Sequence, residues 1–110
     1  MARGDKAALP GGTTTLVLAL LKEGEMYGYQ IIEELEKRSN HVFQLQEGTL
    51  YPILHSLEKA RLVTAREQET PAGRRRRYYR LTAAGLQALE DKKEEWQTFY
   101  QAVTAILAGA

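Results

Sequence analysis

The segment from Glu47 to Glu58 restricts the fold of this chain most strongly, because it combines a helical apolar stripe with a proline. The stripe consists of residues three and four positions apart, Leu50, Ile53, Leu54 and Leu57. A helix tolerates Pro52 best in its first turn, so we expect the cap at Gly48 or Thr49. The side away from the stripe carries Thr49, Tyr51, Pro52, His55, Ser56 and Lys59. Taken alone, the segment fits either a recognition helix that enters a DNA groove or an ordinary amphipathic helix with a hydrated outer face.

Length and composition indicate one globular domain without a membrane segment. The chain has 110 residues, of which 44% are hydrophobic and 26% are charged, so it can bury a modest core. Its longest apolar run, from Leu16 to Leu21, is far shorter than a membrane span. The first twelve residues hold no apolar signal core, and the absence of cysteine excludes disulfides and thiolate metal sites. We therefore expect a cytoplasmic protein.

Positive charge is concentrated in one segment, although the formal net charge is only +1. Between Arg61 and Arg80 seven arginines stand against two glutamates, which leaves +5 in this segment and −4 in the rest of the chain. The densest part is a run of four, Arg74, Arg75, Arg76 and Arg77. Guanidinium groups pair with phosphate oxygens in a bidentate and permanently charged way, so the run suits a DNA backbone. A nuclear localisation signal or a solvated face are the alternatives.

The elements expected along the chain are three helices, a β-hairpin and a closing helix. After a loose arm over residues 1–12, helices are predicted over residues 16–22 (capped by Thr13 to Thr15), 28–38, 49–60 and 83–108. Strand character and a Pro-Gly turn predict a hairpin over residues 62–68 and 74–81, with residues 41–45 a weak candidate for a further strand. This order predicts a mainly α fold with a small β-hairpin (α+β). It corresponds to a winged helix-turn-helix domain over residues 13–82 and a dimerisation helix over residues 83–110.

The last helix carries more apolar surface than such a domain can bury. Its apolar residues keep a heptad register and form the predicted dimer interface, Leu89, Trp96, Phe99, Val103, Ile106 and Leu107. We expect a second copy of the chain to cover this stripe in a two-fold symmetric homodimer. The alternative is a helix that folds back on its own domain.

Three segments of the chain resemble the PadR family of bacterial transcriptional regulators. They occur in the family's order and spacing: Met26-Tyr27-Gly28-Tyr29-Gln30-Ile31, Glu47-Gly48-Thr49-Leu50-Tyr51-Pro52-Ile53-Leu54 with Leu57-Glu58, and residues 73–82, which end in Arg77-Tyr78-Tyr79-Arg80-Leu81-Thr82, with Gly85. The similarity runs from about Thr14 to the end of the chain, and the single short C-terminal helix resembles the compact subgroup of the family. The resemblance implies a dimeric winged-helix repressor that binds a near-palindromic operator and is released by a small molecule.

The resemblance also implies roles for individual residues. In the family the Tyr-Pro helix enters the major groove, which makes Tyr51 the first candidate for a DNA contact. Exposed residues beside it are candidate DNA contacts as well, Thr49, Pro52, His55 and Lys59. In the compact subgroup a tryptophan in the last helix can stack flat ligands across the dimer. A small aromatic effector is therefore predicted to bind Trp96, Phe99 and Tyr100. A tryptophan packed in the dimer seam without space for a ligand is the alternative.

The sequence does not predict catalysis, a metal site or a cofactor. His41 and His55 belong to different elements and lack metal-ligand spacing, and neither a Gly-rich phosphate loop nor a nucleophile elbow occurs. A winged-helix protein-interaction module that has lost DNA binding is the remaining rival, but it would need a neutral or acidic wing. The basic run therefore favours double-stranded DNA as the partner.

Overall fold

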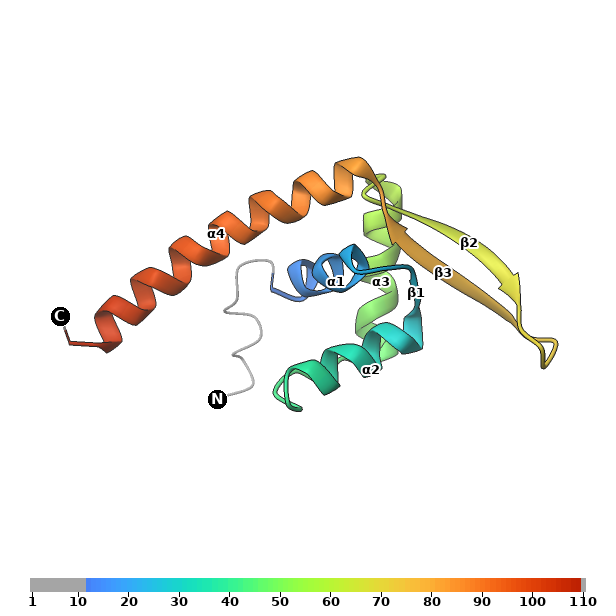
Figure 1. The fold of residues 1–110 in the computed structure, drawn as a ribbon, viewed down its shortest axis with the longest axis horizontal. Helices are drawn as coiled ribbons and strands as arrows, with labels where there is room; N and C mark the ends of the chain where they lie inside the picture. The colour runs from blue at the N-terminus through green and yellow to red at the C-terminus, as the bar shows by residue number, and fades with distance from the viewer. Residues whose placement is uncertain (1–11, 110) are drawn as a thin grey trace.

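The computed structural model describes residues 12–109 as an α+β fold with the predicted order of helices and hairpin (Figure 1). The elements are α1 (Gly12–Lys22), β1 (Met26–Tyr27), α2 (Gly28–Arg38), α3 (Glu47–Lys59), β2 (Val63–Glu69), β3 (Arg75–Leu81) and α4 (Ala83–Leu107). Apart from Gly12, which begins α1, the loose arm predicted over residues 1–12 lies outside the described residues. Within residues 12–109 every helix is too short or too polar to cross a bilayer.

The sheet contains one more strand than the hairpin predicted from the sequence. Its strand order is β1-β3-β2, and both pairs are antiparallel. Strands β2 and β3 form the expected hairpin, which we call the wing, in register from Val63 opposite Leu81 to Glu69 opposite Arg75. The turn between them closes where Gly73 adopts a φ of 84°, a left-handed conformation that glycine reaches without steric cost. Strand β1 has only two residues, too few for a visible alternation of apolar and polar side chains.

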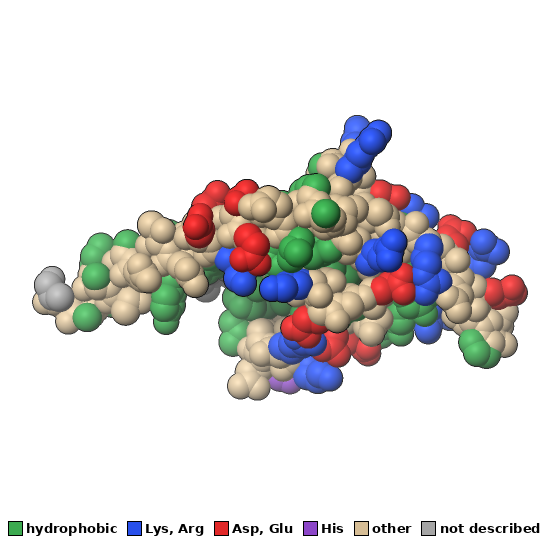
Figure 2. Space-filling model, turned by 45° about the horizontal axis from the view of Figure 1, so that its top comes forward, with side chains coloured by type: hydrophobic (Ala, Val, Ile, Leu, Met, Phe, Trp, Pro, Cys, Tyr) green, Lys and Arg blue, Asp and Glu red, His purple; other side chains and the backbone are tan. Residues whose placement is uncertain are grey.

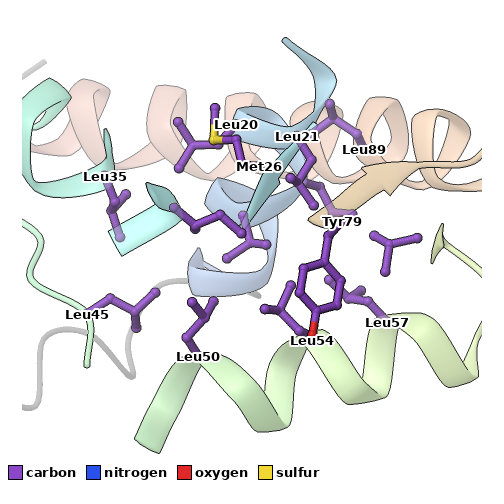
Figure 3. Packing of buried hydrophobic residues seen from close by; sticks show 14 residues of the cluster. Leu20, Leu21, Met26, Leu35, Leu45, Leu50, Leu54, Leu57, Tyr79 and Leu89 are labelled. Atoms are coloured by element: carbon purple, nitrogen blue, oxygen red, sulfur yellow. The ribbon is translucent and has the colours of Figure 1, made fainter. Parts of the chain in front are cut away.

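The core lies where α1, α2 and α3 meet the inner face of the sheet and the start of α4 (Figure 3). Helix α1 is apolar nearly all round and lies centrally, while α3 turns its predicted stripe toward it. Tyr79 reaches the same cluster from β3. The buried hydrophobic residues are Val17, Leu18, Leu20, Leu21, Met26, Ile31, Leu35, Leu45, Leu50, Leu54, Leu57, Val63, Tyr79 and Leu89. Burial of its stripe determines which side of α3 faces solvent.

Two local predictions from the sequence are wrong. Residues 41–45 do not form a strand, because Asn40 and His41 have φ angles of 58° and 65°, which an extended strand cannot accommodate. Instead, the backbone N–H of Phe43 donates to the Ser39 hydroxyl at 3.0 Å within the turn that joins α2 to α3. Helix α1 begins at Gly12, so Thr13 to Thr15 lie inside it and do not cap it. Thr15 belongs to the buried face of this helix.

Helix α4 has two halves with different surroundings. The first half packs on α1 and β3, and Leu89 is only 1% exposed in the core. The second half extends away from the domain, at the end of the molecule opposite the wing (Figure 1). The predicted place of Leu89 in a dimer interface is therefore wrong, because the domain of the same chain encloses its side chain.

The junction between the wing and α4 is tightly packed. Thr82 is the N-cap of α4, and its hydroxyl accepts a hydrogen bond from the Gly85 N–H at 2.9 Å and donates one to the Arg61 carbonyl at 2.8 Å. The Thr82 N–H donates to the Leu62 carbonyl at 3.1 Å. A Cβ on Gly85 would overlap that same carbonyl oxygen, so the close approach of α4 to the start of β2 requires glycine.

Candidate nucleic-acid interface

Helix α3 presents most of the predicted DNA contacts on the side away from the core. The exposed ones are Thr49, Pro52, His55 and Lys59. The helix begins at Glu47, with Gln46 as its N-cap, which is earlier than predicted. Pro52 therefore lies in the second turn and not in the first, and it supplies no N–H to the carbonyl of Gly48. Gly48 is exposed, so water can satisfy that carbonyl.

Tyr51 is held against the start of α2. Its ring packs so closely over Gly28 that a Cβ on this glycine would lie 2.5 Å from the Tyr51 hydroxyl and 2.8 Å from the ring carbon Cε1. Partial burial raises the pKa of the Tyr51 hydroxyl, and the nearby Glu47 and Tyr79 raise it further. The phenol therefore stays protonated near neutral pH and can donate a hydrogen bond to an acceptor outside the helix.

A groove runs between the helices and the wing, with Tyr51 and His55 on its helical side. Its other walls come from the start of α2 and from the run of arginines that leads into β3. The lining residues are Tyr27, Gly28, Tyr29, Glu47, Tyr51, His55, Arg74, Arg75, Arg76, Arg77 and Tyr79. The structure thus brings together the helix and the arginine run, which are separated by more than a dozen residues in the sequence. Thr49, Pro52 and Lys59 are exposed on α3 outside this groove.

Five lining residues were not identified from the sequence as part of an interface. They are Tyr79 and Glu47, together with Tyr27, Gly28 and Tyr29 at the start of α2. The two tyrosines flank Gly28 at the start of α2, and Tyr29 is 54% exposed. The two tyrosines around a glycine were the only sequence signal that could have pointed to this part of the interface. Whether these rings lie exposed beside α3 depends on how α2 packs, which the pattern of residues does not reveal.

Two arginines of the four-residue run, Arg74 to Arg77, pair with carboxylates. Arg75 Nη2 lies 3.0 Å from Glu67 Oε1 on β2. Arg77 Nη2 donates to Glu58 Oε2 on α3 at 2.7 Å. The wing is therefore less basic at these positions than its arginine count indicates.

The other two arginines of the run have no ion pair within residues 12–109. Arg76 lies over the ring of Tyr27, with its guanidinium carbon 4.2 Å from the ring centroid, a cation–π contact that orients the side chain and leaves its charge unneutralised. Arg74 follows the turn, where its backbone N–H donates to the Thr70 hydroxyl at 3.2 Å, and its side chain is exposed. Figure 2 shows Lys and Arg side chains over the half of the molecule that carries the sheet, interleaved with Asp and Glu.

A second cation–aromatic arrangement joins β1 to the wing. The rings of Tyr27 and Tyr78 meet edge to face, with centroids 5.4 Å apart and an interplanar angle of 79°, and the Arg66 guanidinium lies 5.0 Å from the Tyr78 centroid. Arg66 Nε also lies 2.7 Å from Glu25 Oε2. This hydrogen bond lowers the pKa of Glu25 and raises that of Arg66, so both groups stay charged. Together these contacts hold Tyr27 where Arg76 stacks on it.

The predicted effector residues lie on the second half of α4, far from the wing. Trp96 is half-buried and meets Phe99 edge to face, with ring centroids 5.8 Å apart and an interplanar angle of 88°. Tyr100 is 63% exposed beside them. The sequence contains neither Lys nor Arg after Lys93. This half of α4 therefore offers aromatic and aliphatic surface without positive charge.

The sequence matches the transcriptional regulator PadR-like family over residues 17–91, a span that includes α2, α3, the wing and the start of α4. The chain belongs to this family. A transcriptional regulator from Clostridium thermocellum superposes with a TM-score of 0.82 at 30% identity, over 90% of this chain and 96% of that one. A PadR-like transcriptional regulator from Bacillus cereus superposes with a TM-score of 0.78 at 29% identity, over 91% and 95% of the two chains.

The PadR-like chain is also similar in sequence to the transcriptional regulator Rv3488 of Mycobacterium tuberculosis. The two are 43% identical over 72 residues, which is 64% of each chain. Members of the family regulate transcription by binding DNA, so this protein is a DNA-binding regulator and not an enzyme. The winged-helix fold predicted from the sequence is confirmed by the superposition on solved PadR-like structures.

Proposed function

We propose that this PadR-like protein is a ligand-responsive repressor that acts in the cytoplasm as a homodimer on a near-palindromic operator. The observation that carries the proposal is the placement of α3 and the arginine run on two sides of one groove. In this proposal α3 enters the major groove, where its exposed residues meet base edges: Thr49, Tyr51, Pro52 and His55. Lys59 and the two arginines of the run without an ion pair in the described part of the chain, Arg74 and Arg76, bind the phosphate backbone, which positions the helix without reading sequence.

The second half of α4 supports the homodimer. Its apolar side chains are exposed in the single chain, with Ile106 and Leu107 at 77% and 80%. Phe99 and Val103 continue the stripe toward the domain. A second copy related by a two-fold axis would cover this stripe and remove it from water. The dimer would then hold its two recognition helices over successive major grooves, roughly 34 Å apart.

The proposed effector is a flat aromatic molecule that binds between the two long helices. The face assigned to the dimer carries Trp96, Phe99 and Tyr100 together. Since the sequence has no Lys or Arg after Lys93, no nearby cationic side chain competes with a ligand for these rings. The ligand causes release of DNA only if it binds more tightly to a dimer geometry whose wings do not fit the operator than to the geometry that binds DNA. Trp96 is the only tryptophan, so its fluorescence reports binding directly. An unchanged spectrum across a broad panel of aromatic compounds would argue against this effector.

A gel shift tests DNA binding, with a duplex from the region upstream of the protein's own gene and a scrambled duplex of equal composition as the control. We expect one retarded complex at low salt with the native duplex and much weaker retardation with the scrambled one. Six to ten phosphate contacts would reduce affinity roughly 10³- to 10⁵-fold between 50 and 200 mM salt. Equal affinity for the two duplexes would contradict a sequence-specific repressor. Affinity that does not depend on salt would contradict the arginine-based backbone contacts.

A further inference from the structure

Arg77 differs from its neighbours in the wing because carboxylates from two other elements surround it. Its Nη2 lies 2.7 Å from Glu58 Oε2 on α3, and its Nη1 lies 3.7 Å from Glu67 Oε2 on β2. Its guanidinium carbon is 5.9 Å from the ring centroid of Tyr79, which is buried in the core. The charged group is therefore paired within the protein, although part of the side chain stays exposed beside the groove.

The surroundings of Arg77 disfavour a phosphate at this position. A phosphate that approached the guanidinium would come close to the Glu58 and Glu67 carboxylates and would be repelled by both. The Arg77 and Glu58 side chains are 43% and 32% exposed, so the pair is partly shielded from water and salt. To bind a phosphate, Arg77 would have to break its ion pair with Glu58 on α3, the helix that reads the DNA sequence in the proposed function.

Arg76, one residue earlier, has the opposite character. Its side chain lies on the other face of β3, where it stacks on the ring of Tyr27 and has no carboxylate partner within residues 12–109. Arg74 lies beyond the strand, beside the turn, and is likewise without an ion pair in that part of the chain. The arginine run therefore contains side chains free to meet a phosphate and side chains that hold the protein together.

We propose that Glu58 and Arg77 form a strut that fixes the angle between α3 and the wing, so that Arg77 is a positioning residue and Arg74 and Arg76 bind phosphate. The inference rests on the proposed function, because the angle matters only if α3 and the wing contact one duplex. Glu58 lies near the end of α3 and Arg77 near the middle of β3, so their bond spans the gap between the two elements. A partly exposed ion pair raises the population of the aligned orientation, relative to other orientations of α3 and the wing, by no more than about fivefold.

The first test compares two arginines in the full-length protein. A duplex selected by the wild type from a random 30-base-pair library, and a scrambled version of it, serve as probes across 50 to 200 mM salt. Arg76→Gln is expected to lower the slope of log affinity against log salt by about 0.9 per wing, equally for both duplexes. Arg77→Gln is expected to leave the slope nearly unchanged and to reduce discrimination between the duplexes about two- to fivefold. An equal loss of slope in both variants would overturn the strut.

A double-mutant cycle supplies the second test. Glu58→Gln should reduce discrimination as much as Arg77→Gln, and the double variant should be no worse than either single variant, because each change breaks the same bond. Glu69→Gln on β2 is the control, since it removes one carboxylate charge, as Glu58→Gln does, from a residue that forms no ion pair within residues 12–109. Additive losses in the double variant, or an equal loss of discrimination in the control, would overturn the proposal.

A measurement without DNA separates failure of the strut from failure of the proposed function. Amide hydrogen exchange of the free protein should be faster at residues 75–77 in Glu58→Gln than in the wild type, and unchanged there in Glu69→Gln. If exchange responds as expected but the wild type does not discriminate between the duplexes, the proposed function fails. If the wild type discriminates but exchange in Glu58→Gln is unchanged, the strut alone fails.

Discussion

Replacing Gly28 by alanine is expected to weaken DNA binding while leaving the fold largely intact. The new Cβ would lie 2.5 Å from the Tyr51 hydroxyl and 2.8 Å from its Cε1, whereas ordinary contact begins at 3.4 Å. The Tyr51 ring must therefore move by about 1 Å. These atoms are the far end of a partly buried side chain, so the ring can swing toward solvent without forcing α2 and α3 apart.

The two consequences differ in size. Partial loss of ring burial costs about 1 kcal/mol of folding free energy, and the higher helix propensity of alanine in α2 offsets up to about 1 kcal/mol of it. The net change in stability should therefore stay within about 1 kcal/mol. A misplaced Tyr51 would lose the DNA contact proposed for it, which should cost about 1 to 2 kcal/mol and weaken affinity roughly 5- to 30-fold.

Urea unfolding and fluorescence anisotropy with the selected duplex measure the two effects on one preparation. Gly24→Ala is the control, because a Cβ at Gly24 has no neighbour within 4 Å and both quantities should stay unchanged. Tyr51→Phe keeps the ring but removes the hydroxyl, so it should reproduce most of the loss of affinity with the same salt slope. Wild-type affinity in Gly28→Ala would refute the idea that the position of the Tyr51 ring matters for DNA recognition.

The remaining predictions concern stability and assembly. Gly85→Ala should lower the free energy of unfolding in urea by about 2 to 4 kcal/mol, because its Cβ overlaps the Leu62 carbonyl oxygen; unchanged stability would contradict that close approach. Hydrogen bonds from Arg38 lower the pKa values of Glu23 and Glu34 below 4.5. The stability that these two bonds give the fold is therefore complete above pH 4.5 and is lost as the pH falls through the lowered pKa values. In acid titrations followed by circular dichroism, Arg38→Gln should therefore be less stable than the wild type at neutral pH, with the difference vanishing toward pH 3; a constant difference would disprove the linkage. Leu89→Ala should destabilise the domain by about 2 to 5 kcal/mol, because Leu89 is buried in the core. Ile106→Ala should leave the domain fold intact and shift sedimentation toward the monomer, because Ile106 lies on the proposed dimer face. The reverse pattern would contradict the proposed division of α4 into a core half and a dimer half.

The elements that the sequence predicted correctly are those with strong local signals. Three of the four stripe residues of α3 are buried and Ile53 is partly buried, as their spacing indicated, and the wing occurs where β-branched and arginine-rich strands flank a Pro-Gly turn. The long α4 begins at Ala83, where the sequence predicted its start, and Thr82 caps it. These features depend on neighbours within one or two turns, so periodicity and turn chemistry suffice to find them.

Local signals misled where a backbone angle or a single buried side chain decided the outcome. Phe43 and Leu45 alternate as in a strand, but positive φ angles at Asn40 and His41 turn the chain instead. Leu89 keeps the heptad register of the dimer stripe, yet the core of its own chain encloses it. Periodicity identifies an apolar face but not which surface covers it.

The sequence by itself therefore determined the winged-helix architecture, the amphipathic helix α3 proposed to read DNA, and the concentration of positive charge near the wing. Only the tertiary structure decided which of the arginines are paired with carboxylates and which are left without an ion pair within residues 12–109. The pairing of Arg77 with Glu58, the stacking of Arg76 on Tyr27 and the packing of Tyr51 on Gly28 all join residues far apart in the chain. Such contacts arise from the angles at which elements pack, and composition and spacing carry no record of those angles.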